Sequence, residues 1–74
     1  MNDREIAIAA IKEEASRKPD VKIQSGHLSL TYSELAERIE KGDPELIKRF
    51  VKPYQARLQK NLKFKQNILK MLKL

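Results

Sequence analysis

The sequence contains no cysteine and no tryptophan, and it has one histidine and two glycines among its 74 residues. Without cysteine the chain cannot form a disulfide, a thiolate metal site or a cysteine nucleophile. With His27 as the only histidine, a metal site would need carboxylates from elsewhere in the chain. The sequence also lacks a Gly-rich phosphate loop, an HExxH motif and a nucleophile elbow. We therefore expect no enzyme activity, no catalytic residue, no metal site, no cofactor and no small-molecule substrate.

The chain also lacks a long hydrophobic run, although 41% of its residues are hydrophobic. No apolar stretch approaches the roughly 18 residues of a transmembrane helix. The N-terminus is polar and charged before a periodic pattern begins, which is not the form of a signal peptide. A chain this short makes at most one domain, and its core is marginal by itself. We expect a single small cytoplasmic domain over residues 1–74, for which oligomerisation or partner binding is a common source of added stability.

Acidic residues are absent from the last part of the chain. Residues 46–74 carry nine basic residues and no acidic residue, whereas residues 1–45 carry ten acidic and seven basic residues. On a helical wheel most apolar residues of the last stretch share about half of the circle, and most basic residues lie on the other half. Asn61 and Lys65 are exceptions that fall inside the apolar arc. The pattern predicts a basic amphipathic helical extension over residues 46–74.

Pro53 lies within this predicted helix. A proline inside a helix removes one hydrogen bond and clashes with a carbonyl group one turn earlier, which costs about 3 kcal/mol. The apolar face nevertheless keeps its phase across Pro53, from Leu46 and Phe50 to Leu58 and Leu62. We therefore favour one helix kinked at Pro53 over two independent helices.

The first 20 residues predict a helix. Residues 3–17 have an apolar stripe of helical period, with Asn2 or Asp3 as the N-cap. Pro19 ends this helix at or before the preceding residue.

Residues 21–30 alternate with a period of two, which is the pattern of a β-hairpin. A two-residue turn at Ser25-Gly26, where glycine supplies a positive φ, would pair Ile23 with Leu28. This register places all four apolar residues of the segment on one face. Because two strands are not stable alone, we expect that face to pack on a helix.

Thr31 and Glu34 have the spacing of a capping box at the start of a second helix. This helix is predicted from residue 32 to about residue 41, and Gly42 is the left-handed residue that ends it. Asp43 and Pro44 then start the next helix as N-cap and first-turn proline. The predicted fold class is α+β and mostly helical: a helix, a short β-hairpin, a helix, and a long basic amphipathic helix kinked or broken at Pro53. Residues 3–45 form an α-β-β-α unit in this prediction.

The cationic half of the last helix is the strongest functional signal in the sequence. Interspersed acids would make it an ordinary solvated face, but here the like charges repel one another and favour a polyanion or an acidic protein surface. We expect nucleic-acid binding, with duplex favoured, as in a small DNA-associated regulatory or accessory protein. The few aromatic residues, with Tyr54 and Phe64 on the apolar side, argue against stacking on single strands. The candidate nucleic-acid-binding residues are Lys48, Arg49, Lys52, Arg57, Lys60, Lys63, Lys70 and Lys73.

The apolar half of the same helix supports a second hypothesis, a protein–protein interaction or oligomerisation module. The preceding elements are too short to cover a straight helix of this length, so we expect part of its apolar face to pack on another protein or on a second copy as a homodimer. The candidate interface residues are Leu58, Leu62, Phe64, Ile68, Leu69 and Leu72. A third hypothesis is peripheral membrane binding through the apolar residues from Leu62 onward and their flanking lysines.

The segment 35–39, followed by a glycine turn and a basic helix, resembles a helix-turn-helix DNA-binding unit. Its glycine, Gly42, comes two residues later than is usual in that family. The resemblance implies that Lys48, Arg49 and Lys52 lie on a recognition helix.

The order helix, hairpin, helix over about residues 3–41 is similar to that of the small head–tail joining proteins of lambda-type phages. The segments that carry this resemblance are Ser25-Gly26 at the hairpin tip and residues 30–32 at the entry to the second helix. The resemblance implies a virion assembly protein with a basic tail.

Overall fold

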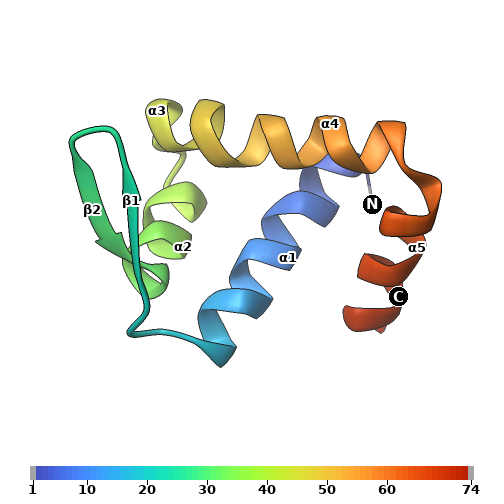
Figure 1. Cartoon of the computed structure of the whole chain (residues 1–74), viewed down its shortest axis with the longest axis horizontal. Coiled ribbons are helices and arrows are strands. Elements are labelled where there is room, and N and C mark those ends of the chain that lie inside the picture. The colour runs from blue at the N-terminus through green and yellow to red at the C-terminus, as the bar shows by residue number, and fades with distance from the viewer. Residues whose placement is uncertain (1, 74) are drawn as a thin grey trace.

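The computed structural model describes residues 2–73, and it consists of helices with one two-stranded hairpin (Figure 1). The elements are α1 (Asp3–Arg17), β1 (Lys22–Ser25), β2 (Leu28–Thr31), α2 (Tyr32–Glu40), α3 (Pro44–Leu46), the π-helical turn η1 (Ile47–Val51), α4 (Lys52–Lys60) and α5 (Leu62–Met71). The segments α3, η1 and α4 follow one another as one rod, with α1, α2 and the hairpin along one side of it (Figure 1). At the end of the rod away from the hairpin, α5 folds back (Figure 1). The predicted α+β, mostly helical fold class is confirmed.

The first helix begins and ends where its sequence predicts. Asn2 is the N-cap: its Oδ1 accepts a hydrogen bond from the Glu5 amide at 2.8 Å, and the Glu5 carboxylate accepts one from the Asn2 amide. Ala7 and Ala10 have no exposed surface. Because the distance between packed helices depends on the side chains at the contact, these alanines let neighbouring helices approach α1 closely. This helix contacts α2, the rod and α5, and it is therefore the centre of the fold.

The hairpin forms, but the predicted turn is wrong by one residue. The turn residues are Gly26 and His27 rather than Ser25 and Gly26. Gly26 has a φ of +60°, and His27 does not have a positive φ. Glycine at the first turn position is the arrangement of a type II′ turn, whereas the predicted turn, as a type I′ turn, would have placed Ser25 at positive φ. The turn therefore forms where only the glycine needs the left-handed conformation.

The corrected register keeps the apolar residues on one face. Each residue's partner is shifted by two positions, and a side-chain face of a strand repeats every two residues. The pairs are Lys22–Thr31, Ile23–Leu30, Gln24–Ser29 and Ser25–Leu28. Leu30 is buried, and Ile23 and Leu28 pack against the core at its edge, as expected for this face. Val21, the fourth apolar residue, precedes β1 and is 46% exposed.

The second helix and the start of the rod have the predicted caps. Thr31 Oγ1 accepts a hydrogen bond from the Glu34 amide at 3.2 Å, and Glu34 Oε1 accepts one from the Thr31 amide at 3.2 Å. Gly42 follows with a φ of +86°. Asp43 Oδ1 then accepts hydrogen bonds from the amides of Glu45 and Leu46, at 3.1 and 3.3 Å. Each cap depends on residues within one turn, which is why the sequence identifies all of them.

The rod accommodates Pro53 through the π-helical turn that precedes it. Within η1 the amide of Lys52 donates to the carbonyl of Ile47, five residues earlier. A π turn inserts one extra residue ahead of the proline, so the missing amide of Pro53 does not end the rod. The fully buried side chains of the rod, Leu46, Val51 and Leu58, are spaced by five and then seven residues. These spacings correspond to one π turn followed by two α turns.

The predicted helix over residues 46–74 is interrupted at Asn61, a break that the apolar periodicity does not indicate. Asn61 has φ −129° and ψ 95°, and its Oδ1 accepts a hydrogen bond from the Phe64 amide at 3.0 Å as the N-cap of α5. The bend brings α5 onto α1. We expected the chain to be too short to cover its last helix, which holds for a straight helix. Because the helix bends at Asn61, α1 covers part of α5. The resulting core contains Ile6, Ala7, Ala10, Ile11, Leu30, Leu35, Ile39, Leu46, Val51, Leu58 and Ile68.

Candidate nucleic-acid interface

The structure divides the nine basic residues of the C-terminal stretch into two groups. Three have partners within the chain: Arg49 and Lys65 pair with carboxylates, and Arg57 lies over an aromatic ring. The other six are exposed lysines that form no ion pair with any of residues 2–73: Lys48, Lys52, Lys60, Lys63, Lys70 and Lys73.

Arg49 links the rod to the tip of the hairpin. Its Nη2 lies 3.2 Å from Glu45 Oε1, one turn earlier, and its Nη1 donates to Ser25 Oγ at 3.1 Å. A Cβ atom at Gly26 would lie 3.0 Å from the same Nη1. The spacing of Glu45 and Arg49 is visible in the sequence, but the contact with the hairpin arises only from the fold. The guanidinium of this predicted nucleic-acid-binding residue is therefore already occupied by intramolecular partners.

Arg57 is held by the aromatic residues at the junction of α4 and α5. Its Cζ lies 4.0 Å from the centroid of the Phe64 ring, and the rings of Tyr54 and Phe64 are 5.5 Å apart with a tilt of 51°. An exposed cation–π contact contributes about 0.5–1 kcal/mol. Burial raises the pKa of Tyr54, the negative charge of Glu14 raises it further, and Arg57 opposes the shift. Tyr54 and Phe64 thus pack on each other, as their place on the apolar side of the helical wheel indicates.

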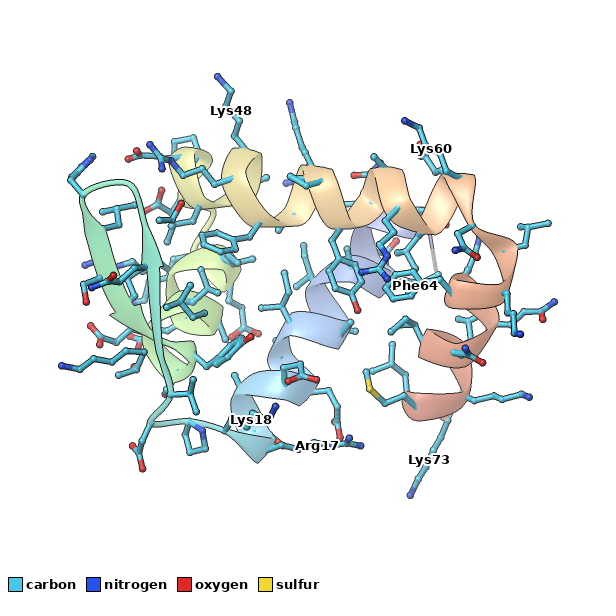
Figure 2. The ribbon with its side chains drawn as sticks, in the orientation of Figure 1. Arg17, Lys18, Lys48, Lys60, Phe64 and Lys73 are labelled. Carbon is cyan, nitrogen blue, oxygen red and sulfur yellow. The ribbon has the colours of Figure 1, made fainter. Side chains whose placement is uncertain are left out.

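Three of the free lysines lie along the rod, and we call Lys48, Lys52 and Lys60 the outer lysine face. All three are exposed. Figure 2 shows Lys48 and Lys60 pointing away from the rest of the protein on the same side of the rod. Their twelve-residue separation corresponds to about 18 Å at the usual helical rise. No acidic residue occurs between Glu45 and the end of the rod.

The remaining candidate lysines are not part of the outer lysine face. Lys63 is in the first turn of α5, Lys70 is in its last turn, and Lys73 follows that helix. Lys73 points to the opposite side of the molecule from Lys48 and Lys60 (Figure 2). The single cationic face expected for a straight helix is therefore divided by the bend at Asn61.

The candidate interface residues have three different environments. Leu58 and Ile68 are buried in the chain's own core, with 0% and 8% of their surface exposed. Phe64, Leu69 and Leu72 are half-buried and pack at the edge of that core. Leu62 is 71% exposed, at the corner where α4 meets α5. Among these six side chains, Leu62 is the one that the chain itself leaves in solvent.

A small apolar cavity of about 150 Å³ lies between α1, the hairpin, α2 and the rod. Glu14 contributes the only carboxylate of its lining, and the other lining residues are Ile11, Ile23, Tyr32, Leu35, Phe50 and Tyr54. Within residues 2–73, no three His, Asp or Glu side chains are grouped closely enough to hold a metal ion.

None of the helices described over residues 2–73 has both the length and the apolar character needed to cross a bilayer. Comparison of the chain with protein-family models, with curated proteins and with solved structures finds no match.

Proposed function

We propose that this protein binds nucleic acid, with duplex favoured, through phosphate contacts made by the outer lysine face. The observation that supports this proposal is that Lys48 and Lys60 project from the same side of the rod, with the exposed Lys52 between them in sequence. No acid follows Glu45 to neutralise them. Free ammonium groups on a rigid scaffold neutralise phosphates and release counterions, which is the main source of sequence-independent affinity.

The geometry supports phosphate contacts more than base readout. The guanidinium groups of Arg49 and Arg57, which suit bidentate contacts with guanine, are engaged with Ser25, Glu45 and Phe64. Lysine is a compact point charge that contacts phosphate without requiring a defined base edge. We therefore propose a DNA-associated accessory role with weak sequence preference.

The same features favour a duplex over a single strand. Single-strand binding usually adds aromatic platforms on which bases stack. Tyr54 and Phe64 pack on each other instead, with Arg57 over the Phe64 ring. The proposed contacts are therefore with the regularly spaced phosphates of a helix.

The test compares two double variants with the same change in net charge. Lys48→Gln/Lys60→Gln removes two charges from the outer lysine face, and Lys70→Gln/Lys73→Gln removes two from the α5 region. Binding to labelled duplex DNA, duplex RNA and single-stranded DNA is measured by fluorescence anisotropy across salt concentrations. The logarithm of affinity for duplex should fall with the logarithm of salt concentration, with a slope of about −0.9 per phosphate neutralised.

We expect the Lys48→Gln/Lys60→Gln variant to weaken duplex binding at all sequences alike and to make the salt slope shallower by about two. The Lys70→Gln/Lys73→Gln variant should keep most of the affinity. Equal losses in the two variants would show that net charge, not this face, determines binding. Absence of binding to every nucleic acid at low salt would exclude the proposal.

A further inference from the structure

The joint between α4 and α5 is a single residue. Asn61 is the only non-helical residue between Lys52 and Met71. Its amide donates to the Arg57 carbonyl at 3.0 Å, and its carbonyl accepts from the Lys65 amide at 3.0 Å. The hydrogen-bond ladders of both helices therefore already end on the same residue.

Only the two dihedral angles of Asn61 separate the bent form from a continuous helix. They are φ −129° and ψ 95°, whereas α-helical values are about −63° and −42°. If Asn61 became helical, the amides of Leu62, Lys63 and Phe64 would find main-chain acceptors one turn earlier, at the cost of the Asn61 cap. Asparagine is tolerated inside helices with only a modest loss of propensity.

The bend leaves one large apolar side chain without a place to pack. Leu62 is 71% exposed, although the side chain one turn earlier, Leu58, is fully buried. In a continuous helix these two leucines lie on the same face. The sequence pattern is that of a straight amphipathic helix, and in the bent form Leu62 is exposed although it belongs to the apolar side of that pattern.

Straightening the chain at Asn61 would separate α5 from α1 of the same chain. In the bent form Ile68 is 8% exposed, and Lys65 Nζ lies 2.7 Å from Asp3 Oδ1 on α1. The surface that matches a detached α5 in shape and charge is α1 of another copy whose own α5 has also detached. The packing of α5 on α1 and the Asp3–Lys65 pair then form again, between two chains instead of within one.

We propose that the protein forms a closed dimer in which two copies exchange α5, with Asn61 as the hinge. Exchange of an identical element is a low-cost route to a symmetric dimer, and short hinge segments favour it. Asp3 then pairs with Lys65 of the other copy, and Arg57 lies over Phe64 of the other copy. The two hinges, each with Leu62, lie at the new contact between copies. Exchange of α5 does not require nucleic-acid binding.

A charge-exchange experiment distinguishes this dimer from ordinary surface association. The Asp3→Lys chain and the Lys65→Asp chain each place like charges together in the monomer and in the homodimer. A mixed dimer with exchanged α5 helices contains two pairs of opposite charges, whereas either homodimer contains two pairs of like charges. The two chains are mixed, refolded together from urea at about 100 µM, and analysed by native mass spectrometry, which separates the three dimers by mass.

Random pairing would give mixed dimer and total homodimer in a ratio of one to one, and we expect this ratio to rise roughly tenfold in favour of the mixed dimer. The Asp3→Lys/Lys65→Asp chain is the matched control, because its homodimer restores both pairs with the charges reversed. Mixed with ¹⁵N-labelled wild-type chain, because the two chains otherwise have equal mass, it would place like charges together in an exchanged dimer, so that mixed dimer should be depleted. Dimers in statistical proportions, or monomers alone, would overturn the proposal.

Variants of the hinge provide a second test that does not depend on the folding of the charge variants. Asn61→Ala removes the cap that favours the bend and raises helix propensity, so the dimer dissociation constant should fall at least about tenfold. Inserting two glycines after Asn61 lengthens the joint and should leave monomers. Sedimentation equilibrium measures both effects. Asn61→Ala that remains monomeric at about 1 mM, or a glycine insertion that leaves dimerisation unchanged, would also overturn the proposal.

Discussion

Asp3 Oδ1 lies 2.7 Å from Lys65 Nζ, and this ion pair joins the first turn of α1 to α5. Lys65 falls inside the apolar arc of the helical wheel, where an unpaired charge would oppose packing. The pair is partly buried, with 31% of the Lys65 side chain and 20% of the Asp3 side chain exposed. Asp3 therefore supplies, from the other end of the sequence, the partner that lets this face of α5 dock on α1.

The two leucines on either side of the bend should respond differently to truncation. Leu58→Ala creates a cavity at a fully buried position, and it should lower the free energy of unfolding by about 2–5 kcal/mol. Leu62→Ala removes an exposed side chain and should change it by no more than about 0.5 kcal/mol. Urea unfolding followed by circular dichroism measures both values at a concentration where the chain is monomeric. Comparable losses in the two variants would contradict the bend at Asn61.

The capping box of α2 should contribute measurably to stability. Thr31→Ala removes the oxygen that accepts from the Glu34 amide and should lower the free energy of unfolding by about 0.5–2 kcal/mol. Ser33 lies in the same turn and is exposed, so Ser33→Ala is the matched control, with an expected change within about 0.5 kcal/mol. Thermal unfolding of the three proteins provides the comparison. Equal melting temperatures for all three would mean that Thr31 does not cap α2 in solution.

Gly26 and Arg49 should be energetically coupled. Gly26→Ala places a side chain at positive φ, which costs about 1–2 kcal/mol, and it crowds Arg49 Nη1 at 3.0 Å. In an Arg49→Ala background only the backbone cost should remain, so the loss caused by Gly26→Ala should be smaller. Gly42→Ala is the control, because Gly42 has a φ of +86° and no atom within 4 Å of the added Cβ position. A double-mutant cycle measures the coupling, and an additive cycle would mean that the two residues do not touch.

Tyr54 should make stability depend on pH above 10. Its pKa is raised above the ordinary value of 10.0, first by burial and then by Glu14. Below pH 10 the phenol is protonated in both folded and unfolded states, so its contribution is constant. Between pH 10 and the raised folded pKa the unfolded state ionises first, and stability therefore falls as pH rises. Urea unfolding between pH 8 and pH 11 should show a shallower fall for Tyr54→Phe than for the wild type. Parallel profiles would exclude this linkage.

Helix caps are predictable from the sequence because the residues that form them lie within one helical turn of one another. The caps at Asn2, Thr31 and Asp43 use hydrogen bonds to amides two or three residues later. The apolar period likewise identifies α1, α2 and the phase of the rod across Pro53. In the hairpin, the alternation of residues 21–30 predicts the correct face. The predicted turn is wrong because the alternation fits a turn at Ser25-Gly26 and a turn at Gly26-His27 equally well. The turn at Gly26-His27 forms because it requires a positive φ only at Gly26.

For the candidate site, the sequence identifies the basic residues but not their partners. The outer lysine face belongs to the predicted set, and the apolar period marks Leu58 and Ile68 without indicating that the chain's own core covers them. Arg49 and Lys65 find Ser25 and Asp3, which lie 24 and 62 positions away in the sequence. Such contacts depend on where distant elements pack, and no local pattern encodes them.

The sequence by itself determined which segments are helices, where most of them begin, and which of their sides are apolar, because propensity, capping and periodicity are properties of neighbouring residues. The tertiary structure alone decided that the last helix bends. A straight and a bent helix have the same apolar period. Asn61 is an N-cap in the bent form and would be an interior residue in the straight form. Within one chain the choice is made by the surface of α1, which buries Ile68 and pairs Asp3 with Lys65 when α5 turns back at Asn61.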